Sequence, residues 1–111
     1  MPRIQIAPVA DVPEGRTKKF QFTRNGKSVE GFIACFRGRL VAYENVCRHI
    51  PLTLDYADNR FFTDDQRHFI CRTHGALYEP HSGLCVEGPC RGERLFPLEI
   101  EISEETIWLK I

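Results

Sequence analysis

Two short segments with the same pair of residue types decide the fold: Cys47-Arg48-His49 and Cys71-Arg72-Thr73-His74. Each presents one thiol and one imidazole from a tight loop, and 21 residues separate the two segments. Four of the five cysteines and all four histidines lie between positions 47 and 90. Because we expect a reducing compartment, this concentration predicts metal binding rather than a disulfide framework.

The flanking segments alternate apolar and polar residues, which is the pattern of β-strands with one buried face. Asn25-Gly26 predicts a tight hairpin, because both turn positions favour a positive φ, and Arg37-Gly38 predicts a second hairpin. Residues 52–74 leave room for at most one short helical turn. The sequence therefore predicts an all-β fold. The apolar residues expected on buried strand faces are Ile4, Ile6, Phe20, Phe22, Leu98, Ile100, Ile102, Ile107, Leu109 and Ile111.

Length and charge exclude several classes of protein. A chain of 111 residues predicts a single domain, and 15 basic against 15 acidic residues argue against a nucleic-acid partner, which usually meets a basic face. No stretch approaches the roughly 18 apolar residues of a membrane span, and the first residues lack the apolar core of a secretory signal. We expect a cytoplasmic protein with no membrane partner.

Two sulfur and two nitrogen ligands suit either a tetrahedral zinc ion or an iron–sulfur cluster. Structural zinc sites usually draw on ligand pairs with two to four intervening residues. Cys47 and His49 have only one residue between them, so the spacing favours iron. Chemistry alone leaves both metals open.

With Gly75 directly after the second His, these segments resemble the Rieske motif, in which two Cys hold one iron and two His hold the other. The resemblance covers residues 41–98 and includes Gly88-Pro89 in a loop that covers the cluster from a third side. It implies an antiparallel β-sandwich or barrel base, with a small cluster-binding subdomain inserted at about residues 45–92. It also implies one 2Fe-2S cluster per chain, with its buried ferric iron on Cys47 and Cys71 and its outer, valence-changing iron on His49 and His74.

The chain departs from the family pattern in two places. The interval of 21 residues is long for a compact Rieske ferredoxin, and we expect the excess to form an additional polar hairpin within residues 58–67. Leu52 and Thr73 stand where Rieske proteins of respiratory and photosynthetic chains carry a loop-locking disulfide. The resemblance is therefore to the soluble ferredoxin type.

Two further positions bear on the reduction potential. High-potential Rieske proteins have a Ser and a Tyr two and four residues past the second His, and here those residues are Ala76 and Tyr78. One hydrogen-bond donor is missing, so we predict a potential in the lower part of the Rieske range, whose floor is roughly −150 mV. A small apolar collar for docking a redox partner is expected from Ile50, Pro51, Leu52, Ala76 and Leu77, and a dry-packed internal role for these residues is the competing account.

The resemblance implies a one-electron carrier rather than an enzyme, passing electrons from a flavin-type reductase to an oxygenase or another terminal oxidoreductase. We expect a monomer or weak oligomer. One alternative is a non-catalytic, Rieske-like small subunit of a larger reductase, and another is a structural zinc-binding domain.

The other candidate residues favour ordinary roles. Cys35 is expected to be a small buried hydrophobe, and packing is favoured for Cys85 and Cys90 over a place near the cluster or pairing on oxidation. His68 and His81 are expected to be surface or hydrogen-bonding residues rather than ligands. Solvated turns account for the acidic pairs Asp64-Asp65 and Glu104-Glu105, and packing accounts for Trp108.

Overall fold

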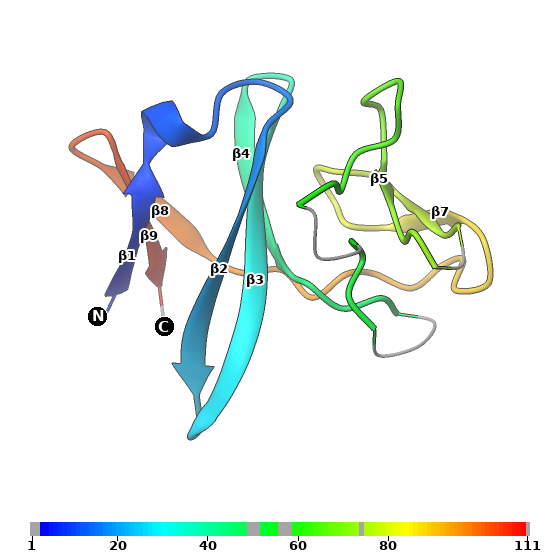
Figure 1. Ribbon diagram of the computed structural model, residues 1–111, viewed down its shortest axis with the longest axis horizontal. Helices are drawn as coiled ribbons and strands as arrows, with labels where there is room; N and C mark the ends of the chain where they lie inside the picture. The colour runs from blue at the N-terminus through cyan, green and yellow to red at the C-terminus, as the bar shows by residue number, and fades with distance from the viewer. Residues whose placement is uncertain (1–2, 49–51, 56–58, 74, 111) are drawn as a thin grey trace. The chain divides into compact units, whose positions relative to one another are not determined.

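The protein, seen in a computed structural model, is described at residues 3–48, 52–55, 59–73 and 75–110 (Figure 1). Its internal contacts divide the chain into two compact units. Met1–Glu44 and Pro97–Ile111 form the first, which we call the sheet unit. Asn45–Phe96 form the second, which we call the loop unit.

The sheet unit contains two antiparallel sheets of three strands each. The first has the order β1-β9-β8, with strands Arg3–Pro8, Thr106–Lys110 and Ile100–Ser103. The second has the order β2-β3-β4, with strands Thr17–Arg24, Lys27–Phe36 and Arg39–Glu44. A single 3₁₀ turn, η1 at Val9–Asp11, follows β1. The all-β prediction is confirmed, and the described residues between Leu52 and Thr73 contain no helix.

Both predicted hairpins are confirmed. Asn25 and Gly26 have φ values of 52° and 76° and join β2 to β3, while Arg37 and Gly38 have 51° and 76° and join β3 to β4. These positive values suit two-residue turns whose twist matches that of the strands. The carboxylate of Glu14 accepts the N–H groups of Arg37 and Gly38 at 2.8 and 2.7 Å, so the second turn has its donors satisfied.

Apolar side chains from both sheets share one core. The residues buried in it are Val12, Phe22, Ile33, Ala42, Leu98, Ile107 and Leu109, and Ile4, Ile6, Phe20 and Ile100 pack against it as predicted. Leu98 precedes β8, and its N–H donates to the carbonyl of Ala42 in β4 at 2.9 Å. The prediction for Ile102 is wrong, because its side chain is 56% exposed. It lies near the end of β8, an edge strand that has a neighbour on one side only. Ile111 lies outside the described residues.

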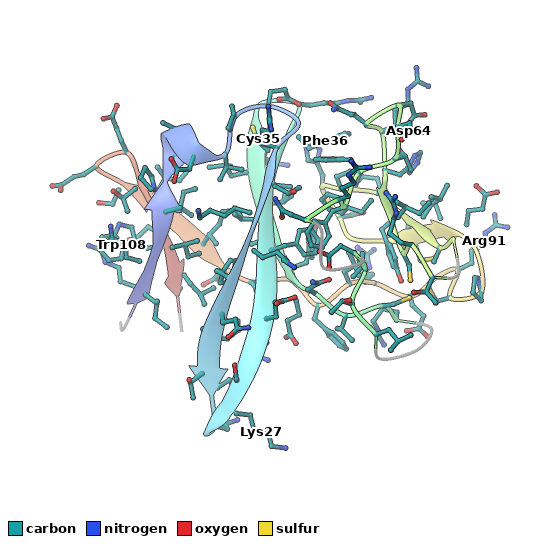
Figure 2. All side chains as sticks on the ribbon, in the orientation of Figure 1. Lys27, Cys35, Phe36, Asp64, Arg91 and Trp108 are labelled. Atoms are coloured by element: carbon teal, nitrogen blue, oxygen red, sulfur yellow. The ribbon has the colours of Figure 1, made fainter. Side chains whose placement is uncertain are left out.

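The loop unit has short strands: β5 Phe69–Ile70, β6 Leu77–Tyr78 and β7 Cys85–Glu87, which pair antiparallel in that order. Ahead of β5, the chain turns back at residues 64–67, where the N–H of Thr63 donates to the carbonyl of His68 at 2.8 Å. Asp64 is labelled at this turn in Figure 2. The additional polar hairpin therefore has its tip within the predicted residues, although Asp58 lies outside the described ones.

No helix among the described residues is long and apolar enough to cross a membrane.

Candidate metal centre

The structure describes two of the four predicted ligands. Cys47 follows β4 by three residues and is 3% exposed, and Cys71 directly follows β5 and is fully buried. Both carry free thiols. His49 and His74 lie outside the described residues. Burial suits a thiolate that binds metal, because the metal replaces the hydration that the sulfur has lost.

The loop that carries Cys47, which we call the first ligand loop, is held closed by both backbone and side-chain hydrogen bonds. The N–H of Cys47 donates to the carbonyl of Leu52 at 2.7 Å. The Asn45 side chain accepts the N–H of Leu54 at 2.9 Å and donates to the carboxylate of Asp55 at 3.0 Å. Asn45 and Asp55 are both buried, so these bonds satisfy groups that would otherwise be costly to bury. They fix the loop that carries Cys47.

The loop that carries Cys71, which we call the second ligand loop, is a tight turn at the end of β5. The N–H of Cys71 donates to the carbonyl of Ala76, and the N–H of Gly75 donates to the carbonyl of Cys71, both at 2.8 Å. Gly75 adopts a φ of +74°, in the left-handed region that glycine enters without strain. The N–H of Arg72 donates to the carbonyl of Leu54 at 2.9 Å. This bond joins the second ligand loop to the first.

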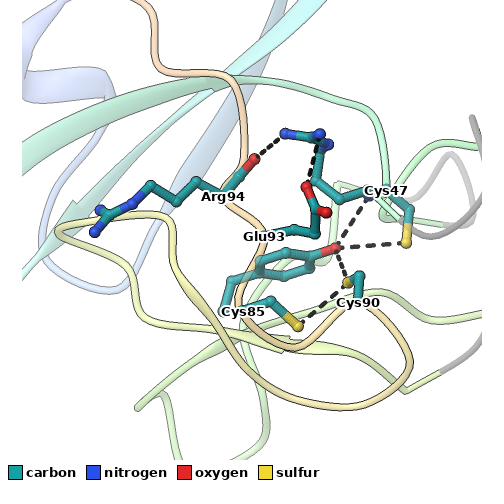
Figure 3. A network of polar contacts seen from close by, with 7 residues as sticks. Cys47, Cys85, Cys90, Glu93 and Arg94 are labelled. Carbon is teal, nitrogen blue, oxygen red and sulfur yellow. Dashed lines mark hydrogen bonds and ion pairs between the residues drawn. The ribbon is translucent and has the colours of Figure 1, made fainter.

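A tyrosine hydroxyl lies beside the first sulfur. The hydroxyl oxygen of Tyr78 lies 3.6 Å from Sγ of Cys47 and 3.1 Å from Sγ of Cys90, and it accepts the N–H of Arg48 at 3.1 Å (Figure 3). Burial raises the pKa of Tyr78, followed by the contact with Cys90, so the hydroxyl keeps its proton. It can therefore donate a hydrogen bond to a sulfur. The donor predicted at Tyr78 is in place, and Ala76 supplies none.

The loop predicted to cover the site meets the second ligand loop at a close approach. Gly88 has a φ of +106°, and a Cβ placed there would lie 2.8 Å from Cα of Ala76. Any larger residue at position 88 would therefore clash with the backbone next to the ligand turn. Ala76 itself is buried, so the prediction that it forms part of an exposed collar is wrong. Of that collar, Leu52 is 46% exposed and Leu77 is half-buried, while Ile50 and Pro51 lie outside the described residues.

Sequence reasoning missed the role of Arg48, which lies between two predicted ligands in the chain. Its guanidinium donates to the carbonyl of Arg94 at 2.6 Å and to the carboxylate of Glu93 at 2.9 Å (Figure 3). It also lies 4.3 Å from the ring centre of Phe96. These three partners hold the backbone of the first ligand loop against residues 93–96. The only signal in the sequence was an Arg between Cys and His.

The remaining cysteines and histidines differ in their surroundings. Cys35 packs against the core of the sheet unit but is half-buried rather than buried as predicted, and its thiol donates toward the Glu14 carboxylate at 3.8 Å. Cys85 and Cys90 are buried, as packing predicts, yet their sulfurs lie 3.2 Å apart. His68 and His81 are half-buried, and neither belongs to a metal-binding group among the described residues.

The donor atoms of the described residues suit a metal that binds thiolates. Two buried thiols lie on loops that share a backbone bond, and a protonated hydroxyl faces one sulfur. Thiolates are ligands for iron–sulfur clusters and zinc, and a metal-bound thiolate accepts hydrogen bonds of this kind. No group of three or more potential ligands occurs among the described residues, from which His49 and His74 are missing. The residues described fit a cluster.

A family model described as the Rieske 2Fe-2S domain matches residues 3–103. A comparison with curated proteins finds no significant match.

Solved structures match over almost the whole chain. The ferredoxin of carbazole 1,9a-dioxygenase from Nocardioides aromaticivorans IC177 superposes with a TM-score of 0.75 at 16% identity, over 98% of this chain and 97% of that one. The terminal oxygenase of carbazole 1,9a-dioxygenase from Novosphingobium sp. KA1 gives 0.78 at 19% identity, over 98% of this chain but 29% of that one. A chain in the complex of reduced oxygenase and oxidized ferredoxin in carbazole 1,9a-dioxygenase gives 0.75 at 20% identity, over 96% and 91%. At these identities the matches show the fold.

Proposed function

The chain belongs to the Rieske 2Fe-2S domain family, and on that premise we propose that it carries single electrons on one 2Fe-2S cluster. The observation that carries the proposal is the pair of buried thiols, Cys47 and Cys71, on two loops joined by the Arg72–Leu54 backbone bond. The cluster supplies the electron chemistry when bound, and the protein supplies position and potential.

We propose that Cys47 and Cys71 bind one iron and that His49 and His74 bind the other. Each ligand pair is separated by only one or two residues, so fixing the cysteine restricts where the histidine can lie. With two thiolates rather than four, the oxidised cluster carries less negative charge, and adding an electron costs less Coulomb energy. Imidazole ligands therefore raise the potential above that of an all-thiolate cluster.

The residues around the sulfurs adjust this potential. The Tyr78 hydroxyl lies 3.6 Å from Sγ of Cys47, and a hydrogen bond donated to that sulfur would stabilise the reduced, more negative state. Buried Ala76 has no hydroxyl to offer at the second donor position. The single donor supports a potential in the lower part of the Rieske range.

The partners are proposed from the match in fold to the ferredoxin of a dioxygenase. The chain spans 97% of the length of a dioxygenase ferredoxin but only 29% of that of a terminal oxygenase. We propose that it accepts electrons from a flavin-type reductase and delivers them to an oxygenase or another terminal oxidoreductase, in the cytoplasm.

Metal analysis and electron transfer test this function together. Anaerobically purified protein should be red-brown, contain about two irons and two acid-labile sulfides per chain, and bleach with dithionite. Its cluster should then be reduced by a flavin-type reductase with a nicotinamide donor, and reoxidised by a terminal oxygenase. Colourless protein that contains zinc would overturn the cluster. A loaded cluster that no reductase reduces, in protein that co-purifies with a large enzyme, would favour a subunit role.

A further inference from the structure

Two cysteines outside the ligand set are placed to react with each other. Sγ of Cys85 and Sγ of Cys90 lie 3.2 Å apart without a covalent bond, and the side chains are 1% and 5% exposed. The contact is drawn in Figure 3. A disulfide has its sulfurs about 2.05 Å apart, so closing this pair needs an approach of only about 1.1 Å.

The backbone holds the two thiols in place. The N–H of Cys85 donates to the carbonyl of Glu93 at 2.8 Å, and its carbonyl accepts the N–H of Gly92 at 3.0 Å. The N–H of Glu93 donates to the carbonyl of Cys90 at 2.9 Å. These bonds fold residues 85–93 back on themselves, so the sulfur contact belongs to a bonded loop rather than to a chance packing of side chains.

The pair is connected to a predicted cluster ligand through one hydroxyl. Cys85 donates to the carbonyl of Glu87 at 3.3 Å, and Cys90 donates to Sγ of Cys85. With its proton directed to Cys85, the Cys90 sulfur accepts from Tyr78 at 3.1 Å. The Tyr78 hydroxyl has a single proton, and Sγ of Cys47 lies farther from it, at 3.6 Å. Cys90 and Cys47 therefore compete for that proton.

We propose that Cys85 and Cys90 are a disulfide-forming site that reacts with low-molecular-weight disulfides of the glutathione class and thereby adjusts the cluster. The thiol chemistry depends only on Cys85 and Cys90, whereas its effect on the cluster rests on the proposed function. Disulfide formation itself requires none of the four proposed cluster ligands.

The exchange balances in two steps. Cys90, the more exposed thiol, loses its proton and attacks one sulfur of the small disulfide, which forms a mixed disulfide and releases one small thiolate. Cys85 then loses its proton and attacks Sγ of Cys90, which forms the Cys85–Cys90 bond and releases the second thiolate. The two protons go to the released thiolates. Two electrons pass from the protein to the reagent, which is reduced to two thiols.

The order of attack follows from the local chemistry. Burial and the neighbouring Cys90 thiol raise the pKa of Cys85 to about 11, so little of Cys85 is present as the reactive thiolate near neutral pH. Once Cys90 carries the mixed disulfide, the attack by Cys85 is intramolecular and over a short distance. The protein therefore forms the Cys85–Cys90 disulfide rather than keeping the small thiol bound to Cys90.

Formation of the Cys85–Cys90 disulfide changes the hydrogen bonding of the Tyr78 hydroxyl. The Cys90 sulfur loses the proton that it shared with Cys85, and with it the polarisation that makes it a good acceptor. The Tyr78 proton is then free to turn to Sγ of Cys47, and a stronger bond there favours the reduced cluster. The disulfide form should therefore have the more positive cluster potential.

The test uses the loaded, full-length protein in the Cys35→Ser background, which removes the half-exposed thiol. The protein is equilibrated in buffers of oxidised and reduced glutathione, quenched in acid, denatured and alkylated with N-ethylmaleimide. Peptide mass analysis should show Cys47 and Cys71 alkylated and Cys85 linked to Cys90, and reduced glutathione should reverse the link. Full alkylation of all four at every ratio, or glutathione retained on Cys90, would overturn the site.

The second readout is the cluster potential, measured by protein-film voltammetry on the two forms. We expect a positive shift on oxidation, and its loss in Tyr78→Phe. Cys90→Ala should resemble the oxidised form and ignore glutathione, while Cys85→Ala cannot close the loop and should retain glutathione on Cys90. Equal potentials, or a shift that survives in Tyr78→Phe, would overturn the adjustment. Protein that forms the disulfide but contains no iron or sulfide contradicts the proposed function and leaves the thiol site standing.

Discussion

The sheet unit and the loop unit are stabilised in different ways. The sheet unit has strands of up to ten residues, in registers set by two-residue turns around one apolar core. In the loop unit, the strands have only two or three residues, and buried polar groups such as Asn45 and Asp55 hold the loops. Short strands contribute little stability by themselves. The loop unit therefore depends on side-chain bonds and, in the proposed function, on its metal ligands.

The largest expected effect follows from removing a proposed ligand in the loop unit. Cys71→Ser should abolish the visible spectrum and reduce iron and sulfide to traces, because a hydroxyl does not replace a buried thiolate as a cluster ligand. Metal binding and folding are coupled, so NMR signals from residues 45–96 should broaden while those of the sheet unit persist. Cys35→Ser, in the sheet unit, is the matched control and should keep the cluster. A coloured Cys71→Ser protein would contradict the ligand assignment.

A cavity made in the apolar core should destabilise the sheet unit and leave the cluster spectrum unchanged. Ile33 is fully buried in β3, so Ile33→Ala should lower the free energy of unfolding by about 2–5 kcal/mol in urea titrations. Its control is Ile102→Ala at a 56% exposed position, where the change should stay within about 0.5 kcal/mol. The cluster spectrum of the folded Ile33→Ala protein should be unchanged. Equal effects at the two sites would disprove the assignment of Ile33 to the core.

The buried polar pair of the loop unit comes next. The Asp55 carboxylate accepts the Asn45 amide at 3.0 Å and the N–H of Asn59 at 2.9 Å. Asp55→Asn places an amide N–H₂ where one acceptor was, which should cost about 1–3 kcal/mol and speed the loss of iron to a chelator. The matched change is Asp64→Asn at an exposed turn, which should release iron at the wild-type rate. If both variants retain iron equally, Asp55 does not position the first ligand loop.

The smallest effect is a pH dependence at Glu79. Burial raises the pKa of Glu79, but the N–H groups of His81 and Ser82, at 3.0 and 2.8 Å, outweigh burial and lower it below 4.5. A lowered folded pKa stabilises the protein above the unfolded pKa, and this contribution is lost as pH falls through the folded value. Glu79→Gln should cost about 1 kcal/mol at pH 7 and nothing once Glu79 is protonated. Urea titrations against pH measure this, with the exposed Glu99→Gln as the control.

The difference between local features and contacts between distant residues explains what the sequence could predict. Turns such as Asn25-Gly26 are local, so both hairpins of the sheet unit follow from residue types alone. The Cys/His pairs are also local, and their spacing predicts the ligand loops. The contacts of Tyr78 with Cys47 and Cys90 span 31 and 12 residues and follow no periodic pattern. The pairing of β1 with β9 joins the two ends of the chain, and exposed Ile102 reflects an edge that alternation does not reveal.

The central claim is that two thiolates hold one iron and two imidazoles hold the other, and nitrogen hyperfine spectroscopy of the dithionite-reduced protein tests it most directly. Electron spin-echo spectra should show two strongly coupled nitrogens, one from His49 and one from His74. In His49→Cys protein that keeps its cluster, one coupling should disappear. Spectra without strongly coupled nitrogen, or protein with no paramagnetic cluster after reduction, would contradict the account.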